Sequence, residues 1–247
     1  YQQLALLHRR YLKSPVIAVT GSVGKTTTRE LIRSSLASLG QVISSTKNNN
    51  NDIGVPLTLL RTNPSNCAAV VVEMGMRGMG QIKRLSACSN PDIAVITNIG
   101  SAHIGILGSR RNIAKAKCEI TSALKPNGLV VIPSGDPILE EELSLVWNGR
   151  IVRVSANHDL EAKSDSHKSL LNPFPQPDFF GSIKNNGGLL DVDGMQFILP
   201  LKGRHNATNF MLALAVADEL DVSWNELVNL QIDVPPGHQD CYMVGSI

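Results

Sequence analysis

Residues 16–27 read VIAVTGSVGKTT, and this stretch decides the fold of the chain. Its first five residues form an apolar run, which predicts a buried strand. Gly21 and Gly24 then predict a tight turn, and the helical pattern of Lys25–Leu39 follows until Gly40 ends it. A strand, a glycine turn and a helix in immediate succession are typical of a βαβ unit.

The turn also carries a chemical signal. Glycines let backbone N–H groups close around phosphate oxygens, and the start of a helix adds a favourable dipole. Lys25 can then reach the β- and γ-phosphates of a nucleotide, and the Thr26 hydroxyl can bind Mg²⁺. An ordinary glycine turn is the alternative, but the Lys-Thr-Thr that follows favours phosphate. We therefore predict a nucleotide site formed by Gly21, Ser22, Val23, Gly24, Lys25, Thr26 and Thr27.

Short β-branched runs alternate with helical patterns further along the chain. This alternation predicts an α/β fold with a doubly wound, mostly parallel sheet. The composition agrees, because 43% of the residues are hydrophobic and only 4% are aromatic, as in an aliphatic sheet covered by helices on both faces. The predicted strands after the first are Val42–Ser45, Ala68–Val72, Ile93–Thr97, Leu129–Ile132 and Ile151–Val154, and the clearest helices between them are Met79–Ala87 and Asn112–Leu124.

The C-terminal third departs from this alternation. Between Asn157 and Pro177 the sequence is polar and interrupted by prolines, which indicates a surface excursion. Turn signals between short apolar runs in Phe179–Leu201 predict antiparallel hairpins, a small β addition to the sheet. Residues 206–220 return to a helical pattern, and Ser223 with Glu226 three residues later predicts the capped start of a second helix.

Charge and cysteine usage exclude several classes of function. The net charge of +2 is too balanced for a nucleic-acid-binding surface. No run of eighteen apolar residues appears, so we expect no membrane span. The cysteines are scattered without a CxxC pair, which argues against a zinc site or a disulfide framework and favours a reducing compartment. They are Cys67, Cys88, Cys118 and Cys241.

The glycine turn differs from the general P-loop pattern, which expects a glycine where this chain has Val19. The shorter form, TGxxGKTT, is the variant of the Mur ligases and their folate-polyglutamate relatives, and four further segments resemble Mur ligases in the family's order. They are residues 46–60 (TKNNNNDIGVPLTLL), 69–75 (AVVVEMG), 97–103 (TNIGSAH) with 114–120 (AKAKCEI), and 201–209 (LKGRHNATN). The resemblance covers nearly the whole chain.

The resemblance implies an ATP-dependent ligase that forms an amide bond in a peptidoglycan precursor, and thus a role in cell-wall biogenesis, cell shape and cell division. VEMG and NNDIGVPLTLL favour the type that adds D-alanyl-D-alanine to UDP-N-acetylmuramoyl-tripeptide through an acyl phosphate. A ligase of the folate-polyglutamate or cyanophycin type, which uses the same ATP site on a different acid, is an alternative. A nucleotide-binding module without ligase activity is another.

The resemblance implies two Mg²⁺ ions and gives Lys25, Glu73, His103 and Lys117 catalytic roles. Glu73 would bind metal together with Thr26, since hard oxygen ligands suit Mg²⁺; an ordinary solvated carboxylate after a strand is the alternative. His103 would bind the second ion, although a lone histidine is more often a satisfied core or surface residue. Lys117 would support that ion as a carbamate formed with CO₂.

Carbamylation requires an amine that is neutral part of the time, and burial lowers the pKa of a lysine in that direction. From the residues alone Lys117 reads as an exposed helix lysine, and Lys115 nearby competes for the role. The second lysine of AKAKCEI is the one that matches the family's helix. We therefore assign the carbamate to Lys117.

Two groups of asparagines complete the predicted site. Asn206 and Asn209 lie three residues apart on one helical face, and the resemblance implies that their amides meet the adenine ring; a helix cap and a surface asparagine are the ordinary alternative. The muramoyl-peptide side would be lined by polar residues that otherwise read as a plain polar loop. These are Thr46, Asn48, Asn50 and Asn51.

Complete Mur ligases have three domains, and this sequence matches the central one. We expect residues 1–14 to be a linker helix from a preceding domain, residues 15–234 the ATP-binding domain, and residues 235–247 an irregular tail where a third domain would begin. His238 stands where the family has arginine. The chain alone should bind nucleotide but ligate poorly, because ligation depends on domain closure. We expect a monomer in the bacterial cytoplasm or in the plastid stroma.

Overall fold

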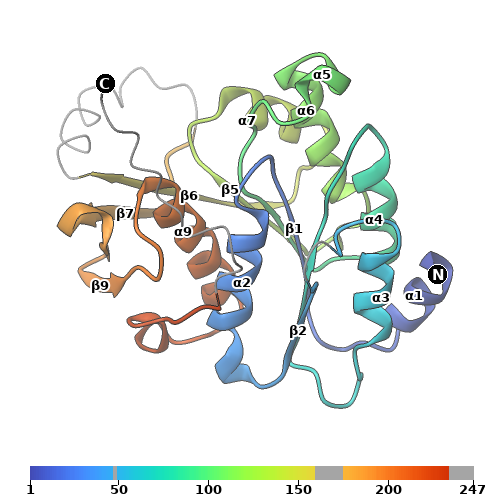
Figure 1. Cartoon of the computed structure of the whole chain (residues 1–247), viewed down its shortest axis with the longest axis horizontal. Coiled ribbons are helices and arrows are strands. Elements are labelled where there is room, and N and C mark those ends of the chain that lie inside the picture. Colours follow the sequence, from blue (N-terminus) through green and yellow to red (C-terminus); the bar gives the residue numbers. More distant parts are fainter. Residues whose placement is uncertain (47–48, 159–174, 234–247) are drawn as a thin grey trace, which may run out of the picture.

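A computed structural model describes residues 1–46, 49–158 and 175–233 (Figure 1). Most of the predicted polar excursion and the predicted C-terminal tail lie outside these residues. The described chain forms one sheet with the strand order β2-β3-β1-β4-β5-β6-β7-β8-β9. The strands are β1 (Val16–Thr20), β2 (Val42–Ser44), β3 (Ala69–Glu73), β4 (Ile93–Ile96), β5 (Leu129–Pro133), β6 (Arg150–His158), β7 (Phe179–Lys184), β8 (Leu189–Val192) and β9 (Met195–Ile198).

The sheet is parallel from β2 across to β7, and β7, β8 and β9 are antiparallel. This is the doubly wound, mostly parallel sheet with a small antiparallel addition that the sequence predicts. Nearly every residue of the central strands is buried, because helices cover both faces. The helices are α1 (Gln2–Arg9), α2 (Lys25–Ser35), α3 (Gly54–Leu60), α4 (Gln81–Ser89), α5 (Ile104–Leu107), α6 (Arg110–Cys118), α7 (Pro137–Ser144) and α9 (Arg204–Glu219).

Two hydrophobic cores lie on opposite sides of the sheet. One contains α2 and α9, which pack side by side against alternate residues of β1 such as Ile17 and Val19. The other contains α1, α3, α4, α6 and α7, packed against the intervening residues Val16 and Ala18. Figure 1 shows α2 and α9 on one side of the strands and α3 and α4 on the other. Because successive side chains of a strand point to opposite faces of the sheet, β1 contributes residues to both cores.

The strand order places a switch point at β1. From β1 the chain passes through α2 to β2 on one side, and from β3 it passes through α4 to β4 on the other. In open parallel sheets, ligands bind outside the carboxyl ends of the strands at such a point. A ligand-binding site is therefore expected at the loops that follow β1, β3 and β4.

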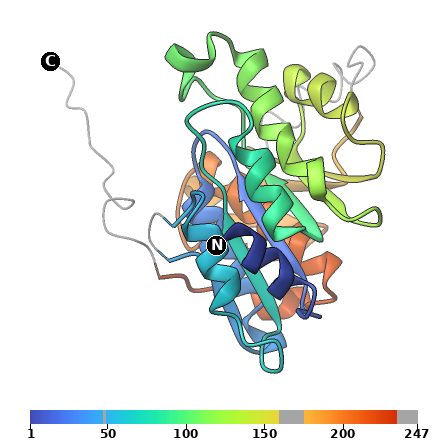
Figure 2. The same cartoon turned by 90° about the vertical axis from the view of Figure 1, so that its right-hand side faces the viewer.

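Helix α1 packs closely on the rest of the described domain. It lies against α3 and α4 (Figure 2). Arg9 is buried and donates to Asp92 at 2.6 Å and to the backbone oxygens of Ser89 at 2.9 Å and Leu12 at 3.0 Å. Asp92 also accepts from the Val16 N–H at 2.7 Å, so α1 is anchored to the start of the central strand.

Several predicted elements differ in type. The helix over Lys25–Leu39 is α2 up to Ser35, followed by a 3₁₀ turn at Ala37–Leu39, and the helix over Asn112–Leu124 is α6 followed by a 3₁₀ turn at Glu119–Ala123. The prediction of a capped helix at Ser223 was wrong. Trp224–Leu227 is a single 3₁₀ turn, and the Ser223 side chain makes no cap hydrogen bond. Turns of this kind satisfy the last carbonyls of a helix within a short length of chain.

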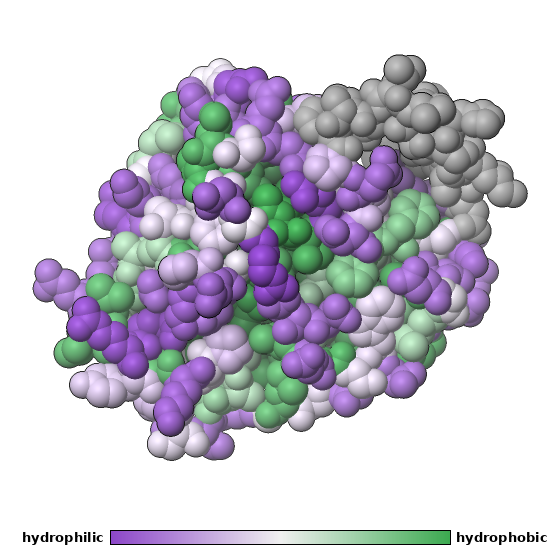
Figure 3. All heavy atoms as spheres, turned by 180° about the vertical axis from the view of Figure 1, so that it is seen from behind, coloured by the Kyte–Doolittle hydropathy of each residue, from purple (hydrophilic) through white to green (hydrophobic). Residues whose placement is uncertain are grey.

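The surface of the described residues is mixed. On the face shown in Figure 3, hydrophobic residues lie among hydrophilic ones. Among the described helices, none is both long and apolar enough to cross a membrane.

Candidate active site

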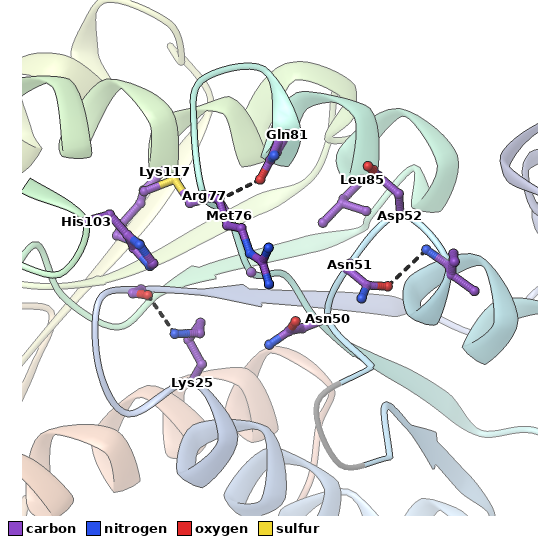
Figure 4. A pocket seen from close by; sticks show the side chains of 13 residues that line it. Lys25, Asn50, Asn51, Asp52, Met76, Arg77, Gln81, Leu85, His103 and Lys117 are labelled. Atoms are coloured by element: carbon purple, nitrogen blue, oxygen red, sulfur yellow. Dashed lines mark hydrogen bonds between the residues drawn. The ribbon is translucent and has the colours of Figure 1, made fainter. Parts of the chain in front are cut away.

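A cavity of about 520 Å³ opens at the carboxyl edge of the sheet, between the loops that follow β1, β3 and β4 (Figure 4). It brings together residues from segments far apart in the chain, several of which are predicted site residues. The lining comprises Gly21, Lys25, Asn50, Asn51, Asp52, Ile53, Gly75, Met76, Arg77, Gln81, Leu85, His103 and Lys117.

The turn predicted to bind phosphate, residues 21–27 and called the phosphate-binding turn below, lies at one end of this cavity. Gly24 precedes α2 with φ of 79°, a left-handed conformation that glycine adopts readily. Lys25 bends back over the turn and donates to the Gly21 oxygen at 3.1 Å. Burial lowers the pKa of Lys25, and the charge of Glu73 opposes that shift. An incoming phosphate would replace the carbonyl oxygen as the partner of this ammonium group.

The turn is clamped by the segment after β4. Asn98 accepts from the Val23 N–H at 3.1 Å and donates its amide to the Val23 oxygen at 2.9 Å, and its own backbone oxygen accepts from the Ser22 N–H at 3.2 Å. The Ser22 hydroxyl accepts from the Gly100 N–H at 2.9 Å. Thr97 adds a hydroxyl donor to the Val23 oxygen. The loop that carries His103 and the phosphate-binding turn are thus one hydrogen-bonded unit.

Both glycines of the turn are required by close approach. A Cβ atom on Gly21 would lie 1.8 Å from the Thr97 hydroxyl oxygen. One on Gly24 would lie 2.9 Å from the side-chain oxygen of Asn209. Real Cβ atoms do not come so near, so neither position accepts a side chain without movement. Buried Asn209, one of the predicted adenine-side residues, therefore lies directly against the phosphate-binding turn.

Glu73 is the last residue of β3 and only 2% exposed. Its Oε2 accepts from the Thr26 hydroxyl at 2.9 Å and from Arg29 at 3.1 Å, and its Oε1 accepts from the Asn50 amide at 2.9 Å. Thr26 and Glu73, the two predicted ligands of one metal ion, are therefore adjacent. A solvated carboxylate, the ordinary alternative for Glu73, is excluded by its burial.

Arg29 links this carboxylate to a chain of charges along α2. It also donates to Glu30 at 2.7 Å and 3.1 Å, and Glu30 accepts from Arg33 at 2.7 Å. Arg29 is 3% exposed, so Glu73 has a buried positive partner. A buried carboxylate without such a partner would be driven toward its neutral form.

Lys117 is the largest of the most deeply buried side chains and is 1% exposed, yet it lines the cavity. Burial, together with the charge of Lys25, lowers its pKa to about 7. Within the described residues its ammonium group has no hydrogen bond or ion pair. Lys115, two residues earlier on α6, is exposed and does not line the cavity. The structure therefore separates the two lysines that the sequence left in competition.

His103 lies on the cavity wall, at the point where the loop after β4 meets α5. Its φ of 68° is left-handed, which is uncommon outside glycine. The same loop is held by Arg110, which donates to the Ile99 oxygen at 3.0 Å and to Asp136 at 2.9 Å. His103 is exposed, so its ring is open to a ligand in the cavity.

Only some of the predicted substrate-side and adenine-side residues lie at the cavity or the phosphate-binding turn. Asn50 and Asn51 line the cavity, but Asn50 donates to Glu73, and the Asn51 oxygen accepts from the backbone of Ile53 and Gly54 at the start of α3. Thr46 is exposed and does not line the cavity, and Asn48 lies outside the described residues. Asn206 is partly exposed and donates to the Lys202 oxygen at 2.9 Å, one turn away from Asn209.

The oxygen atoms of Thr26 and Glu73 are suited to bind a divalent cation. Among the described residues, no three histidine, cysteine, aspartate or glutamate side chains gather as a ready-made metal centre. Thr26 and Glu73 instead present two oxygens 2.9 Å apart beside the phosphate-binding turn. Such a pair suits Mg²⁺, which is bound through one or two protein oxygens and completes its shell with waters and phosphates. The residues present therefore fit Mg²⁺ that arrives with a nucleotide.

The fold and this geometry agree with a comparison to protein families. The model of the Mur ligase middle domain matches residues 19–217. The chain belongs to the Mur ligase family. The relatives most similar in sequence include the UDP-N-acetylmuramoyl-tripeptide–D-alanyl-D-alanine ligases of Synechocystis sp., 39% identical over the whole chain and half of the relative, and of Escherichia coli, 32% identical over 94% of the chain and 50% of the relative.

Solved structures of Mur ligases give the same result. MurF from Acinetobacter baumannii superposes with a TM-score of 0.81 at 30% identity over 96% of this chain and 50% of that one. MurF from Thermotoga maritima in complex with ADP gives 0.75 at 26% identity over 95% and 52%. The predicted family, its MurF-type resemblance and the fold class are confirmed. The chain spans about half the length of the curated relatives it matches.

Four residues in or beside this cavity were not predicted from the sequence. Arg29 and Asn98 make the contacts that hold Glu73 and the phosphate-binding turn, Thr97 packs on Gly21, and Arg77 lines the cavity. Asn98 and Thr97 belong to the quoted TNIGSAH segment, so the motif located them without their roles. Arg29 gave no signal, because one helical arginine in a charged stretch looks like a solvated side chain.

Proposed function

We propose that the protein containing this chain is an ATP-dependent ligase that adds D-alanyl-D-alanine to UDP-N-acetylmuramoyl-tripeptide. The relatives named for that reaction support the assignment. One observation carries it: Lys25 of the phosphate-binding turn and buried Lys117 line the same cavity, close enough for the charge of Lys25 to lower the pKa of Lys117. A nucleotide-binding module without chemistry would have no need of the second lysine.

The proposed reaction has two steps. An oxygen of the tripeptide's terminal carboxylate attacks the γ-phosphorus of ATP, the bond to the β-phosphate oxygen breaks, and ADP leaves an acyl phosphate behind. The amine of D-alanyl-D-alanine then attacks the acyl carbon, inorganic phosphate departs with the C–O electron pair, and the nitrogen loses a proton. Because two anions meet in the first step, Lys25 lowers the barrier by stabilising charge on the phosphoryl group.

Thr26 and Glu73 would hold Mg²⁺, with His103 and Lys117 on the cavity side for a second ion. The metal would supply charge neutralisation at the phosphates. Arg29 and Asn50 hold the Glu73 carboxylate beside Thr26 through their hydrogen bonds. Glu73 is thus already placed before any ion arrives.

Lys117 would serve as a carbamate. With a pKa of about 7, roughly half of these amines are neutral near pH 7, and a neutral amine adds to CO₂ with loss of one proton. The product carries a negative charge in place of a positive one, beside Lys25. It would therefore relieve the repulsion between the two lysines and add oxygen ligands to the cavity.

We assign the remaining contacts from the same placement. Asn209, against the phosphate-binding turn, and Asn206, one turn earlier on α9, would face the adenine side of the nucleotide. Asn50 and Asn51, which line the cavity, would face the acid substrate. We further propose that residues 15–234 act as the central domain of a three-domain ligase, with 1–14 as its linker from a first domain, and that the ligase works as a monomer in the bacterial cytoplasm or the plastid stroma.

The test is a reconstituted ligation. The full-length gene product that contains this chain is mixed with Mg-ATP, UDP-N-acetylmuramoyl-tripeptide and D-alanyl-D-alanine, and ADP release and the mass of the product are followed. We expect ADP release that requires both substrates and a product larger by D-alanyl-D-alanine less one water. The Lys25→Ala variant should lose it, while Lys115→Ala, an exposed lysine off the cavity, should retain it. ADP release with a folate acid in place of the tripeptide would assign a different ligase.

A further inference from the structure

Arg77 is a cation in the cavity that the proposed chemistry does not use. It lies in the loop between β3 and α4 and lines the cavity together with Gln81. Figure 4 shows its side chain extending into the middle of the pocket, above Lys25 and Asn50 in this view. Within the described part of the chain, its guanidinium group has no hydrogen bond or ion pair, so five N–H donors are available to a ligand.

The loop that carries Arg77 is held firmly. The Arg77 N–H donates to the Gln81 side chain at 2.6 Å, and the Gly75 N–H donates to the Asn50 oxygen at 2.7 Å. Further along, the Gly80 N–H donates to Glu119 at 2.7 Å. The buried Met76 side chain packs into the core beneath. A loop anchored at this many points presents its arginine from a fixed backbone position.

The charge balance of the cavity favours an anionic ligand. Apart from Lys117, which would be the carbamate proposed above, the lining carries Lys25 and Arg77 as basic groups and Asp52 as the acidic one. Asp52 is already engaged by Arg84 at 3.3 Å and by a side-chain amide of α1. Lys25 lies at the nucleotide end, so Arg77 is the positive charge left in the lining for a second anion.

We propose that Arg77 binds a carboxylate of the acid substrate and determines which acid the site accepts. This inference rests on the proposed function. A planar guanidinium matches a carboxylate through two parallel hydrogen bonds. A tripeptide offers its terminal carboxylate and any side-chain carboxylate, and the reaction needs the terminal one aimed at the γ-phosphate. Arg77 binds either the terminal carboxylate itself or a neighbouring side-chain carboxylate, and in both cases it orients the terminal carboxylate toward the γ-phosphate.

Calorimetric titration tests the proposal. UDP-N-acetylmuramoyl-tripeptide is titrated into the full-length gene product, saturated with magnesium and a non-hydrolysable ATP analogue. Compared with wild type, Arg77→Ala should weaken tripeptide binding by about 10- to 100-fold. Arg77→Lys should recover part of it, because an ammonium is a single point donor. The matched control, Lys83→Ala on α4, removes an exposed cation that does not line the cavity and should change nothing.

Substrate analogues decide whether the contact is direct. Tripeptides amidated at one carboxylate at a time should bind wild type more weakly than the unmodified tripeptide does. For the carboxylate that Arg77 holds, the Arg77→Ala variant should bind the amidated and the unmodified tripeptide with the same affinity. Which amide shows this coupling identifies the carboxylate. Independent, multiplicative losses for every amide would overturn the proposal, as would weaker binding of UDP alone or of the nucleotide in Arg77→Ala. Failure of wild type to bind the tripeptide at all would instead overturn the proposed function.

Discussion

At the scale of single residues, Lys117 shows how burial creates chemistry. A lysine in water stays protonated through the whole physiological range, but this one lies within the core beside another lysine. The pKa of about 7, against an ordinary value of 10.5, means that the folded protein releases a proton that the unfolded chain still holds. The unfolded state therefore binds more protons between these two values, and the free energy of unfolding rises with pH across that window.

Replacement of this lysine should remove the pH dependence. We expect Lys117→Met to have a higher free energy of unfolding than wild type at pH 7, by about 3 kcal/mol, because methionine fills a similar space without a charge to desolvate. Toward pH 10 the two proteins should converge, as wild type gains about 1 kcal/mol per pH unit from this group. Urea unfolding at pH 7, 8 and 9 in CO₂-free buffer measures it. Parallel curves for the two proteins would contradict the assignment.

The residue types of the site were readable from the sequence, but their environments were not. Motif spacing identified Lys25, Glu73 and Lys117 as candidates, yet only the folded packing shows that Glu73 and Lys117 are buried. Burial depends on which elements close over a side chain, and that information is spread along the whole chain. The same holds for Arg29, whose partner Glu73 lies 44 residues away.

At the scale of elements, the phosphate-binding turn depends on a neighbour in space. Its backbone conformation is fixed by Asn98, through hydrogen bonds to both the N–H and the oxygen of Val23. Asn98→Ala leaves the Val23 N–H without its partner and the Val23 oxygen with the Thr97 hydroxyl alone. Because the turn must hold its shape to receive phosphates, we expect a loss of about tenfold in Mg-ATP affinity.

Calorimetric titration of Mg-ATP measures this loss. Asn66→Ala, which removes an exposed asparagine far from the turn in sequence, serves as the matched control and should bind as wild type does. A thermal midpoint measured in parallel separates local loosening from global unfolding. Wild-type affinity in Asn98→Ala would show that the turn holds its shape without the clamp.

Elements with strong periodicity were predictable, and the short ones were not. The parallel strands and α9 follow directly from apolar runs and helical spacing. Helix α3 was not predicted, because Gly54 and Pro56 lie in its first turn and these residue types are typical of loops. Helix α7 had a readable start, with Asp136 as its N-cap and Pro137 in its first turn, but its few core-facing residues gave a weak pattern. The turn at Trp224 is too short for sequence to separate it from a helix.

At the scale of the whole molecule, α1, the proposed linker helix, is anchored to the domain that follows it. Arg9 is 4% exposed and joins α1 to Asp92 and to three backbone oxygens. We expect Arg9→Met to lower the free energy of unfolding by about 2–4 kcal/mol, because it leaves these acceptors unpaired while Asp92 keeps the Val16 N–H and Lys125. Urea unfolding provides the measurement, and Arg10→Met, its exposed neighbour, is the control. Equal losses in the two variants would refute a specific anchor.

The whole chain should bind nucleotide by itself. The phosphate-binding turn, its clamp at Asn98 and the adjacent Asn209 all lie within it, so we expect these residues to suffice for binding. Titration of Mg-ATP into the chain should give saturable binding at one site. Lys25→Ala removes the ammonium that faces the phosphates and should weaken binding by about 10- to 100-fold, since hydrogen bonds to charged groups contribute about 1.5–3 kcal/mol.

Two comparisons make this titration decisive. Lys115→Ala removes an exposed lysine of α6 and should bind as wild type does. Omission of Mg²⁺ should weaken binding to wild type but weaken it less in Glu73→Gln, because the carboxylate acts on the nucleotide through the metal. Equal magnesium dependence in both proteins would place the ion away from Glu73 and leave that residue with a structural role beside Arg29. Wild-type affinity in Lys25→Ala would mean that the phosphates do not enter the turn.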